Sequence, residues 1–107
     1  MEHTEQIPIK NGQGTWHKEM EHDKKIESDL EISSPDEGKW DIIFYDEDNP
    51  QGKTGRFEEI KDVEAHRHIH VKHTMEKKFL VVDFIWSEHR DTTLKINAKC
   101  NAKCEHK

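Results

Sequence analysis

Two stretches of the 107-residue chain are apolar on both of their sides. In Phe79–Trp86 only Asp83 is polar among eight positions, and Trp40–Tyr45 holds five apolar residues in six, although only 31% of the whole chain is hydrophobic. A strand with water on one side alternates polar and apolar residues, and a large apolar side chain left exposed forfeits about 1.5–3 kcal/mol. Both stretches are therefore predicted to be strands that are covered on both faces.

The function of these two strands depends on what covers their second face, and the sequence leaves three candidates for this cover. One is the segment that contains Phe57, Ile60 and Val63, and another is the N-terminal arm with Ile7 and Ile9. The third is another protein chain. Because few apolar residues remain for a further layer, we expect part of this face to be a protein contact surface. Its predicted residues are Phe79, Val81, Ile85, Ile43 and Tyr45.

The rest of the chain shows the two-residue period of half-buried strands, most clearly at 16–22, 26–32 and 94–100. The segment 56–64 is ambiguous because its apolar residues recur every third position, which one or two helical turns would also give. We favour a strand there and keep a short helix as the alternative. The expected fold is all-β, a small antiparallel meander that forms a sandwich or barrel of six to eight strands.

The length of the chain allows one domain. Residues 1–13 are predicted to be a flexible lead-in with one short edge strand, 14–100 the single β domain, and 101–107 a polar tail. The turn residues of Ser34–Gly38 predict that Lys39–Asp46 returns antiparallel to the strand before it. Gly52-Lys53-Thr54 resembles the end of a phosphate-binding loop, but Asp48 stands where that motif needs a glycine, so we expect no phosphate site.

Three of the nine histidines, His66, His68 and His70, alternate along one predicted strand. If Thr74–Lys77 closes a four-residue turn, this strand pairs with Phe79–Trp86, and Asp83 lies opposite His68. Two histidines and one carboxylate are a common ligand set for zinc or iron. We favour a structural ion pair on a solvated face. The alternative is a metal-binding domain, or a metalloenzyme, whose ligands are His66, His68, His70 and Asp83.

The two cysteines form a second candidate metal site at the C-terminus. Cys100, Cys104 and His106 carry soft ligand atoms, but no fourth ligand is near in sequence, so we favour a polar tail with two thiols. Two cysteines also do not form the disulfide framework of a small secreted domain.

Gly14-Thr15-Trp16 opens the first amphipathic strand and resembles the Gly-x-Trp signature of calycins, the lipocalin, fatty-acid-binding and avidin group. The resemblance covers three residues. It implies an up-and-down barrel around a small apolar ligand, with Trp16 at one end, and related small barrels inhibit other proteins. This chain is short for an eight-stranded barrel, and strands apolar on both sides are not required there. The alternative is a core tryptophan beside a glycine turn.

Charge and motif content exclude several functions. A net charge of −6 without a basic stripe argues against nucleic-acid binding. No apolar run approaches the roughly 20 residues of a membrane helix, and no secretory signal is visible, so we expect a soluble cytoplasmic protein. No catalytic motif is found. The expected function is a small non-enzymatic binding or inhibitory protein that recognises a protein partner or forms a homo-oligomer, with no required cofactor.

Overall fold

The computed structural model describes residues 2–20, 25–33, 37–64 and 66–100, and these ranges form eight strands and no helix. The expected all-β class is therefore confirmed. The strands in chain order are β1 (Glu2–Ile9), β2 (Gln13–Glu19), β3 (Lys25–Ser33), β4 (Lys39–Glu47), β5 (Arg56–Glu64), β6 (His68–Thr74), β7 (Phe79–Trp86) and β8 (Thr92–Cys100).

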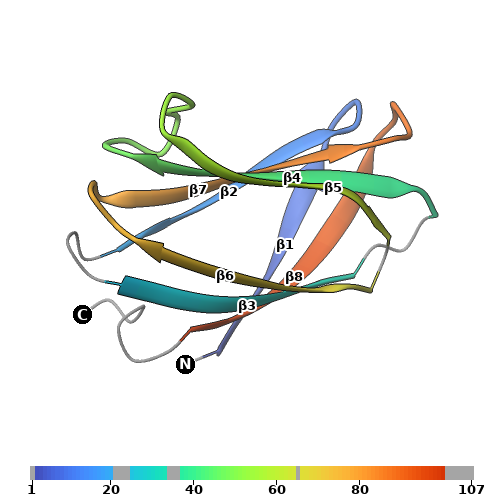
Figure 1. Ribbon diagram of the computed structural model, residues 1–107. Coiled ribbons are helices and arrows are strands. Elements are labelled where there is room, and N and C mark those ends of the chain that lie inside the picture. Colours follow the sequence, from blue (N-terminus) through green and yellow to red (C-terminus); the bar gives the residue numbers. More distant parts are fainter. Residues whose placement is uncertain (1, 21–24, 34–36, 65, 101–107) are drawn as a thin grey trace.

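The eight antiparallel strands form two four-stranded sheets that lie face to face (Figure 1). Sheet I has the strand order β1-β8-β3-β6, and sheet II has the order β2-β7-β4-β5. The fold is thus a sandwich rather than a closed barrel. Among the eight strands only β4 and β5 are neighbours both in the chain and in a sheet, so the predicted meander order is wrong. The other consecutive strands lie in different sheets.

The main core lies between the sheets, where the alternating strands point their apolar residues at each other. Trp40 of β4 and Trp86 of β7 stack with ring centroids 5.6 Å apart, and both are almost fully buried. Ile7 and Ile9 of β1 are also buried in this core. The segment before residue 14 therefore belongs to the folded sandwich through an edge strand that pairs with β8 along its whole length.

The two strands predicted to be apolar on both sides, β4 and β7, are the central pair of sheet II. Their register places Phe44 beside Val82 on the inner face and Tyr45 beside Val81 on the outer face. The inner residues join the main core, and the outer residues form a separate apolar cluster. Side-by-side pairing explains why both stretches carry the same unusual pattern.

The predicted hairpin between the strand at 26–32 and Lys39–Asp46 is wrong, because β3 lies in sheet I and β4 in sheet II. Leu30 of β3 and Phe44 of β4 are both buried in the main core. Because the two strands lie in opposite layers, the apolar side of each one faces the core between the sheets. Two strands paired within one sheet lie side by side and could not face each other in this way. Of the expected turn, residues 34–36 lie outside the described part of the chain.

The predicted pairing of the histidine strand with Phe79–Trp86 is also wrong. β6 pairs with β3 at the edge of sheet I, whereas β7 pairs with β2 and β4 in sheet II. The connection crosses between the layers because Met75 is buried in the core and the Asp46 carboxylate accepts hydrogen bonds from the backbone N–H groups of Glu76 (2.8 Å) and Lys77 (3.0 Å). An apolar residue in an otherwise polar turn was the sequence signal for this crossover.

The ambiguous segment 56–64 is a strand, β5, as favoured from the sequence. Its three-residue period comes from β-bulges. Trp40 pairs with Val63 while Ile42 pairs with Ile60, so β5 contributes an extra residue there, and Asp62 has a positive φ of 59°. The N–H of Asp62 donates to the Asp41 carboxylate at 3.1 Å. A bulge re-aims the following side chains, so both Ile60 and Val63 face the core.

Candidate functional site

The structure brings all five predicted contact residues together on the outer face of sheet II. Val81 is completely buried at the centre of this cluster, Ile43 and Tyr45 are each 8% exposed, and Phe79 and Ile85 are half-buried at its ends. We call these five residues the outer patch: Ile43, Tyr45, Phe79, Val81 and Ile85.

Neither of the two intramolecular covers expected from the sequence lies over the outer patch. Phe57, Ile60 and Val63 pack against the main core, and so do Ile7 and Ile9. These two candidate covers therefore do not serve as the cover, because the bulges of β5 and the pairing of β1 with β8 direct these residues inward.

A lysine from the loop between β4 and β5 covers part of the outer patch. The Lys53 ammonium lies 5.6 Å from the centroid of the Tyr45 ring and forms an ion pair with Asp83. It also lies 3.4 Å from the Thr15 hydroxyl, which donates to Asp83 at 2.7 Å. The lysine thus places its charged end over an aromatic ring while that charge stays paired. Sequence reasoning missed this role.

The loop that carries Lys53 is held in place by Glu47. Glu47 is 3% exposed. Its carboxylate accepts hydrogen bonds from the Thr54 N–H (2.8 Å), the Thr54 hydroxyl (3.2 Å) and the Gly55 N–H. A Cβ on Gly55 would lie 2.2 Å from the Asp46 carbonyl oxygen, so the close approach of the loop requires glycine there. The residues that resembled a phosphate-binding loop therefore organise a lysine cover instead.

Tyr45 is the ionisable group of the outer patch. Burial, followed by the negative charge of Asp83, raises the pKa of its hydroxyl above the ordinary value of 10.0, and a hydrogen bond with Asp83 acts in the same direction. The phenol therefore stays neutral at physiological pH and presents an apolar ring with a polar tip, a combination that is common at protein interfaces.

Two of the candidate metal ligands, His68 and His70, lie on the outer face of sheet I, away from Asp83. His68 of β6 is opposite Glu31, with 3.4 Å between Nε2 and the carboxylate, and His70 is opposite Asp29, with 2.5 Å between Nδ1 and the carboxylate. Asp83 lies in sheet II between Thr15 and Ile43. The predicted His68–Asp83 pair is therefore wrong, because β6 and β7 are in different layers.

The predicted metal ligands are accordingly not assembled into one group. His66 follows β5 with a positive φ of 63°, and its Nδ1 lies 3.2 Å from the Ser33 hydroxyl. Within the ranges that the structure describes, no three His, Cys, Asp or Glu side chains are arranged to hold a metal ion. Cys104 and His106 lie outside those ranges, as does the side chain of Cys100.

His70 has the clearest electrostatic environment on this face. Its hydrogen bond to Asp29 raises its pKa above 6.5, and the charges of Asp29 and Glu27 add to this effect. Lys72 lies 3.3 Å from Glu27, so acids of β3 face bases of β6 along the strand pair. The outer face is polar and solvated, as the sequence interpretation favoured, but the carboxylates that face the histidines come from β3 and not from Asp83 of β7.

Trp16 lies in the main core and its indole N–H donates to the Glu5 carboxylate at 2.9 Å. A Cβ on Gly14 would lie 2.5 Å from Cδ1 of Ile9 and 2.8 Å from the Pro8 carbonyl oxygen, so glycine permits the close approach of β1. The space between the sheets is filled by large side chains, which include Trp40, Phe44, Phe84 and Trp86. These local requirements explain the Gly-x-Trp pattern in this chain.

A polar contact that sequence reasoning missed joins the two layers. Nε2 of His73 in β6 lies 2.8 Å from the Asp46 carboxylate of β4, and its ring stacks on Phe57 of β5 with centroids 3.7 Å apart. Asp46 is 6% exposed. Together with the bonds from Glu76 and Lys77, this contact fixes where β6 leaves sheet I.

Comparisons of the chain with protein-family models, with curated proteins and with solved structures found no match. None of the described segments is a helix of the length and apolarity that crossing a membrane would require.

Proposed function

We propose that this protein is a non-enzymatic binding protein that recognises a protein chain through the outer face of sheet II. The single observation that supports the proposal is the outer patch, a contiguous apolar cluster outside the main core. A tyrosine and a phenylalanine within a polar surround are the composition expected at the centre of a protein interface.

The charges around the outer patch favour a second copy of this chain as its occupant. Arg56 lies beside Tyr45 in the sheet, Glu59 beside Ile43, and Asp41 beside Ile85, so the rim carries both signs. In a two-fold contact the same surface meets itself, and a rim of mixed sign then allows opposite charges to meet across the contact. A partner of one charge sign would meet like charges on part of this rim.

Light scattering and sedimentation equilibrium over a range of protein concentrations test the proposal. We expect a reversible dimer of the wild-type chain. Phe79→Glu and Ile85→Glu place a charge at half-buried positions of the outer patch, so each is expected to weaken dimerisation at least about tenfold while the fold is retained.

Lys95→Glu is the matched control, because Lys95 is exposed on the central strand β8 of sheet I, remote from the outer patch. Its dimerisation constant is expected to equal that of the wild type. A monomer at every concentration, or equal weakening by Lys95→Glu and Phe79→Glu, would overturn the proposal.

A further inference from the structure

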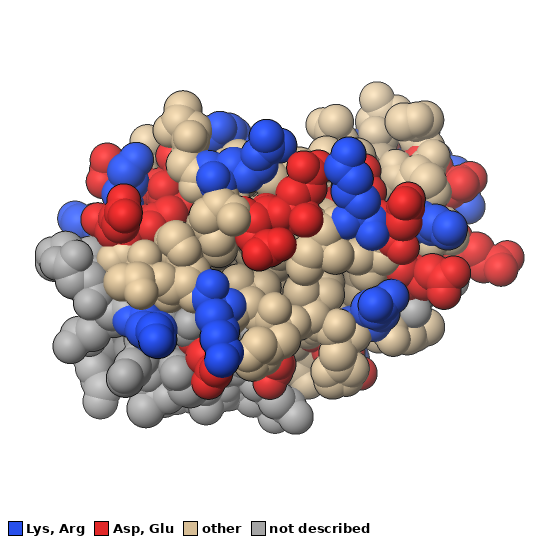
Figure 2. All heavy atoms as spheres, viewed as in Figure 1, with Lys and Arg blue, Asp and Glu red and all other residues tan. Residues whose placement is uncertain are grey.

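The sandwich has an open side, where the edge strands β5 of sheet II and β6 of sheet I face each other without pairing. Figure 2 shows this side in the same view as Figure 1: charged side chains of both signs lie along the upper sheet, and the band between the sheets is mostly uncharged. A cleft of about 200 Å³ lies between the two edge strands.

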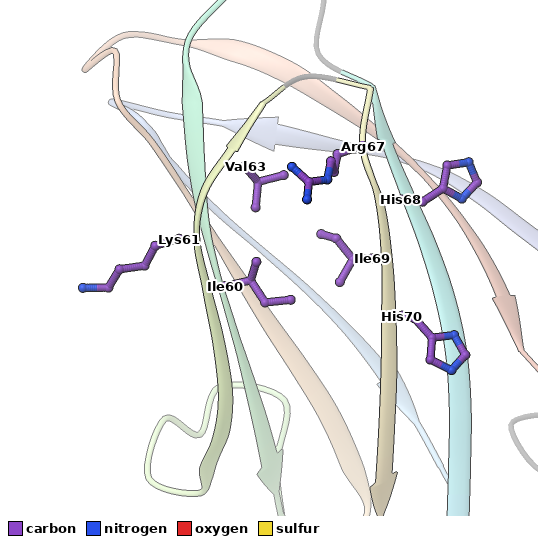
Figure 3. Close-up of a pocket in the computed structure, with 7 residues that line it drawn as sticks. All are labelled: Ile60, Lys61, Val63, Arg67, His68, Ile69 and His70. Atoms are coloured by element: carbon purple, nitrogen blue, oxygen red, sulfur yellow. The ribbon is translucent and has the colours of Figure 1, made fainter.

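The floor of the cleft is apolar and comes from both sheets. Ile60 and Val63 of β5 and Ile69 of β6 point into the cleft in Figure 3. Val63 is 2% exposed and Ile69 is 5% exposed, so the floor is a rigid part of the main core. The bulge at Asp62 is what brings both Ile60 and Val63 to this side of β5.

One cation points into the cleft. The Arg67 guanidinium lies between the two strands in Figure 3, whereas Lys61, His68 and His70 point away. Within the described part of the chain, no ion pair or side-chain hydrogen bond satisfies this guanidinium. Its backbone is held in place, because the Arg67 carbonyl accepts a hydrogen bond from the Ile32 N–H at 3.0 Å.

Among the described residues, Arg67 is thus an exposed, unpaired arginine beside an apolar floor, in a chain with 23 acidic residues and 17 lysines and arginines. A guanidinium offers a planar pair of donors that matches a carboxylate, and the apolar floor offers burial to an aliphatic chain. The cleft volume of about 200 Å³ is roughly seven times the ~30 Å³ that one water molecule occupies in the liquid.

From this geometry we propose that the cleft between β5 and β6 binds a small amphipathic carboxylate, with the carboxylate on Arg67 and a short aliphatic chain over Ile60, Val63 and Ile69. This site is distinct from the outer patch and does not depend on self-association. Octanoate, with seven carbons beyond its carboxylate group, is the probe that the volume suggests.

Titration of the ¹⁵N-labelled protein with octanoate, followed by NMR, tests the proposal. We expect saturable shifts confined to the amides of β5 and β6 around the cleft. Arg67→Gln is expected to lower the affinity at least about tenfold, because a hydrogen-bonded charge pair is lost. Acetate, which lacks the chain, and octanol, which lacks the charge, are each expected to bind more weakly.

Lys61→Gln is the matched control: it removes a positive charge from a residue at the same cleft that points away from it. Its affinity is expected to equal that of the wild type, and Arg67→Lys is expected to retain more affinity than Arg67→Gln. The proposal is overturned if octanoate shifts residues of another face, if no saturation is reached, or if Arg67→Gln and Lys61→Gln have the same effect. Each variant's folding is checked by its own NMR spectrum.

Discussion

The outer face of sheet I is polar where β3 meets β6, and Asp29 and Glu31 lie there opposite His70 and His68. The outer face of sheet II instead carries the outer patch, with Val81 completely buried at its centre. Both faces belong to antiparallel sheets of four strands. The strands pair in the same antiparallel way in both sheets, although β5 of sheet II is bulged, and the contrast between the two outer faces lies in their side chains.

The two outer faces of the sandwich are thus built differently, one from polar cross-strand contacts and the other from an apolar cluster that a loop partly covers. On sheet I, cross-strand ion pairs remain in water, where each contributes little to stability. On sheet II, a lysine from a loop lies over the Tyr45 ring and pairs with Asp83 of the same outer face, and within the outer patch Phe79 and Ile85 are the more exposed residues. Among the described residues, only the second face carries an apolar cluster outside the main core.

The largest expected effect comes from placing a carboxylate on the outer face of sheet II, compared with the same change on the outer face of sheet I. Val81→Asp puts a charge at a completely buried position and is expected to lower the free energy of unfolding by about 3 kcal/mol or more. Thr93→Asp, at an exposed position on the central strand β8 of sheet I, is expected to cost about 1 kcal/mol or less. Urea unfolding measures both, and equal losses would remove the distinction between the faces.

A smaller effect is expected in the titration of Tyr45, which ultraviolet absorbance follows cleanly because it is the one tyrosine in the sequence. The contribution of Tyr45 to stability is present in full below pH 10.0 and is lost as the pH rises through the raised pKa of the folded state. Asp83→Asn is expected to lower the pKa of Tyr45, since the negative charge that opposes ionisation is removed.

Asp41→Asn serves as the control for this titration, because Asp41 lies on the same outer face but is not among the causes of the Tyr45 shift. An equal change of the Tyr45 pKa in the two variants would show that the overall charge of this face, rather than the contact with Asp83, sets that pKa.

The smallest effect is expected at His70, whose side chain is about half exposed (51%). Its raised pKa means that its contribution to stability is present in full below pH 6.5 and is lost as the pH rises through the folded-state value. Asp29→Asn removes the first cause of the shift, so NMR titration of the imidazole is expected to give a lower pKa for His70. Glu31→Gln, whose carboxylate is not a cause of the shift, is the comparison; an equal fall there would contradict the pairing of His70 with Asp29.

Much of the face assignment could be predicted from the sequence. The two-residue period at 26–32 and 94–100 predicted half-buried strands, and Leu30, Ile32, Leu94 and Ile96 all lie in the main core. The outer patch was also predicted residue by residue. Alternation is a local property of the extended backbone, so it can be read without knowledge of which strands pair.

The pairing of strands could not be predicted in the same way. The turn at Thr74–Lys77 suggested a hairpin, but Asp46, nearly thirty residues earlier in the chain, anchors the crossover instead. The position of Asp83 followed from that error, and with it the predicted group of metal ligands. The cleft at Arg67 was missed for the same reason, because its two walls come from edge strands of different sheets.

The amino-acid sequence alone determined the all-β class, the two strands that are apolar on both sides, and which of their side chains point away from the main core. The tertiary structure decided which strands are neighbours, that Lys53 covers Tyr45, and that β5 and β6 leave a cleft between them. The physical reason is range: the pleat of a strand orients adjacent residues, whereas layer order and cover depend on contacts between segments far apart in the chain, which no local pattern encodes.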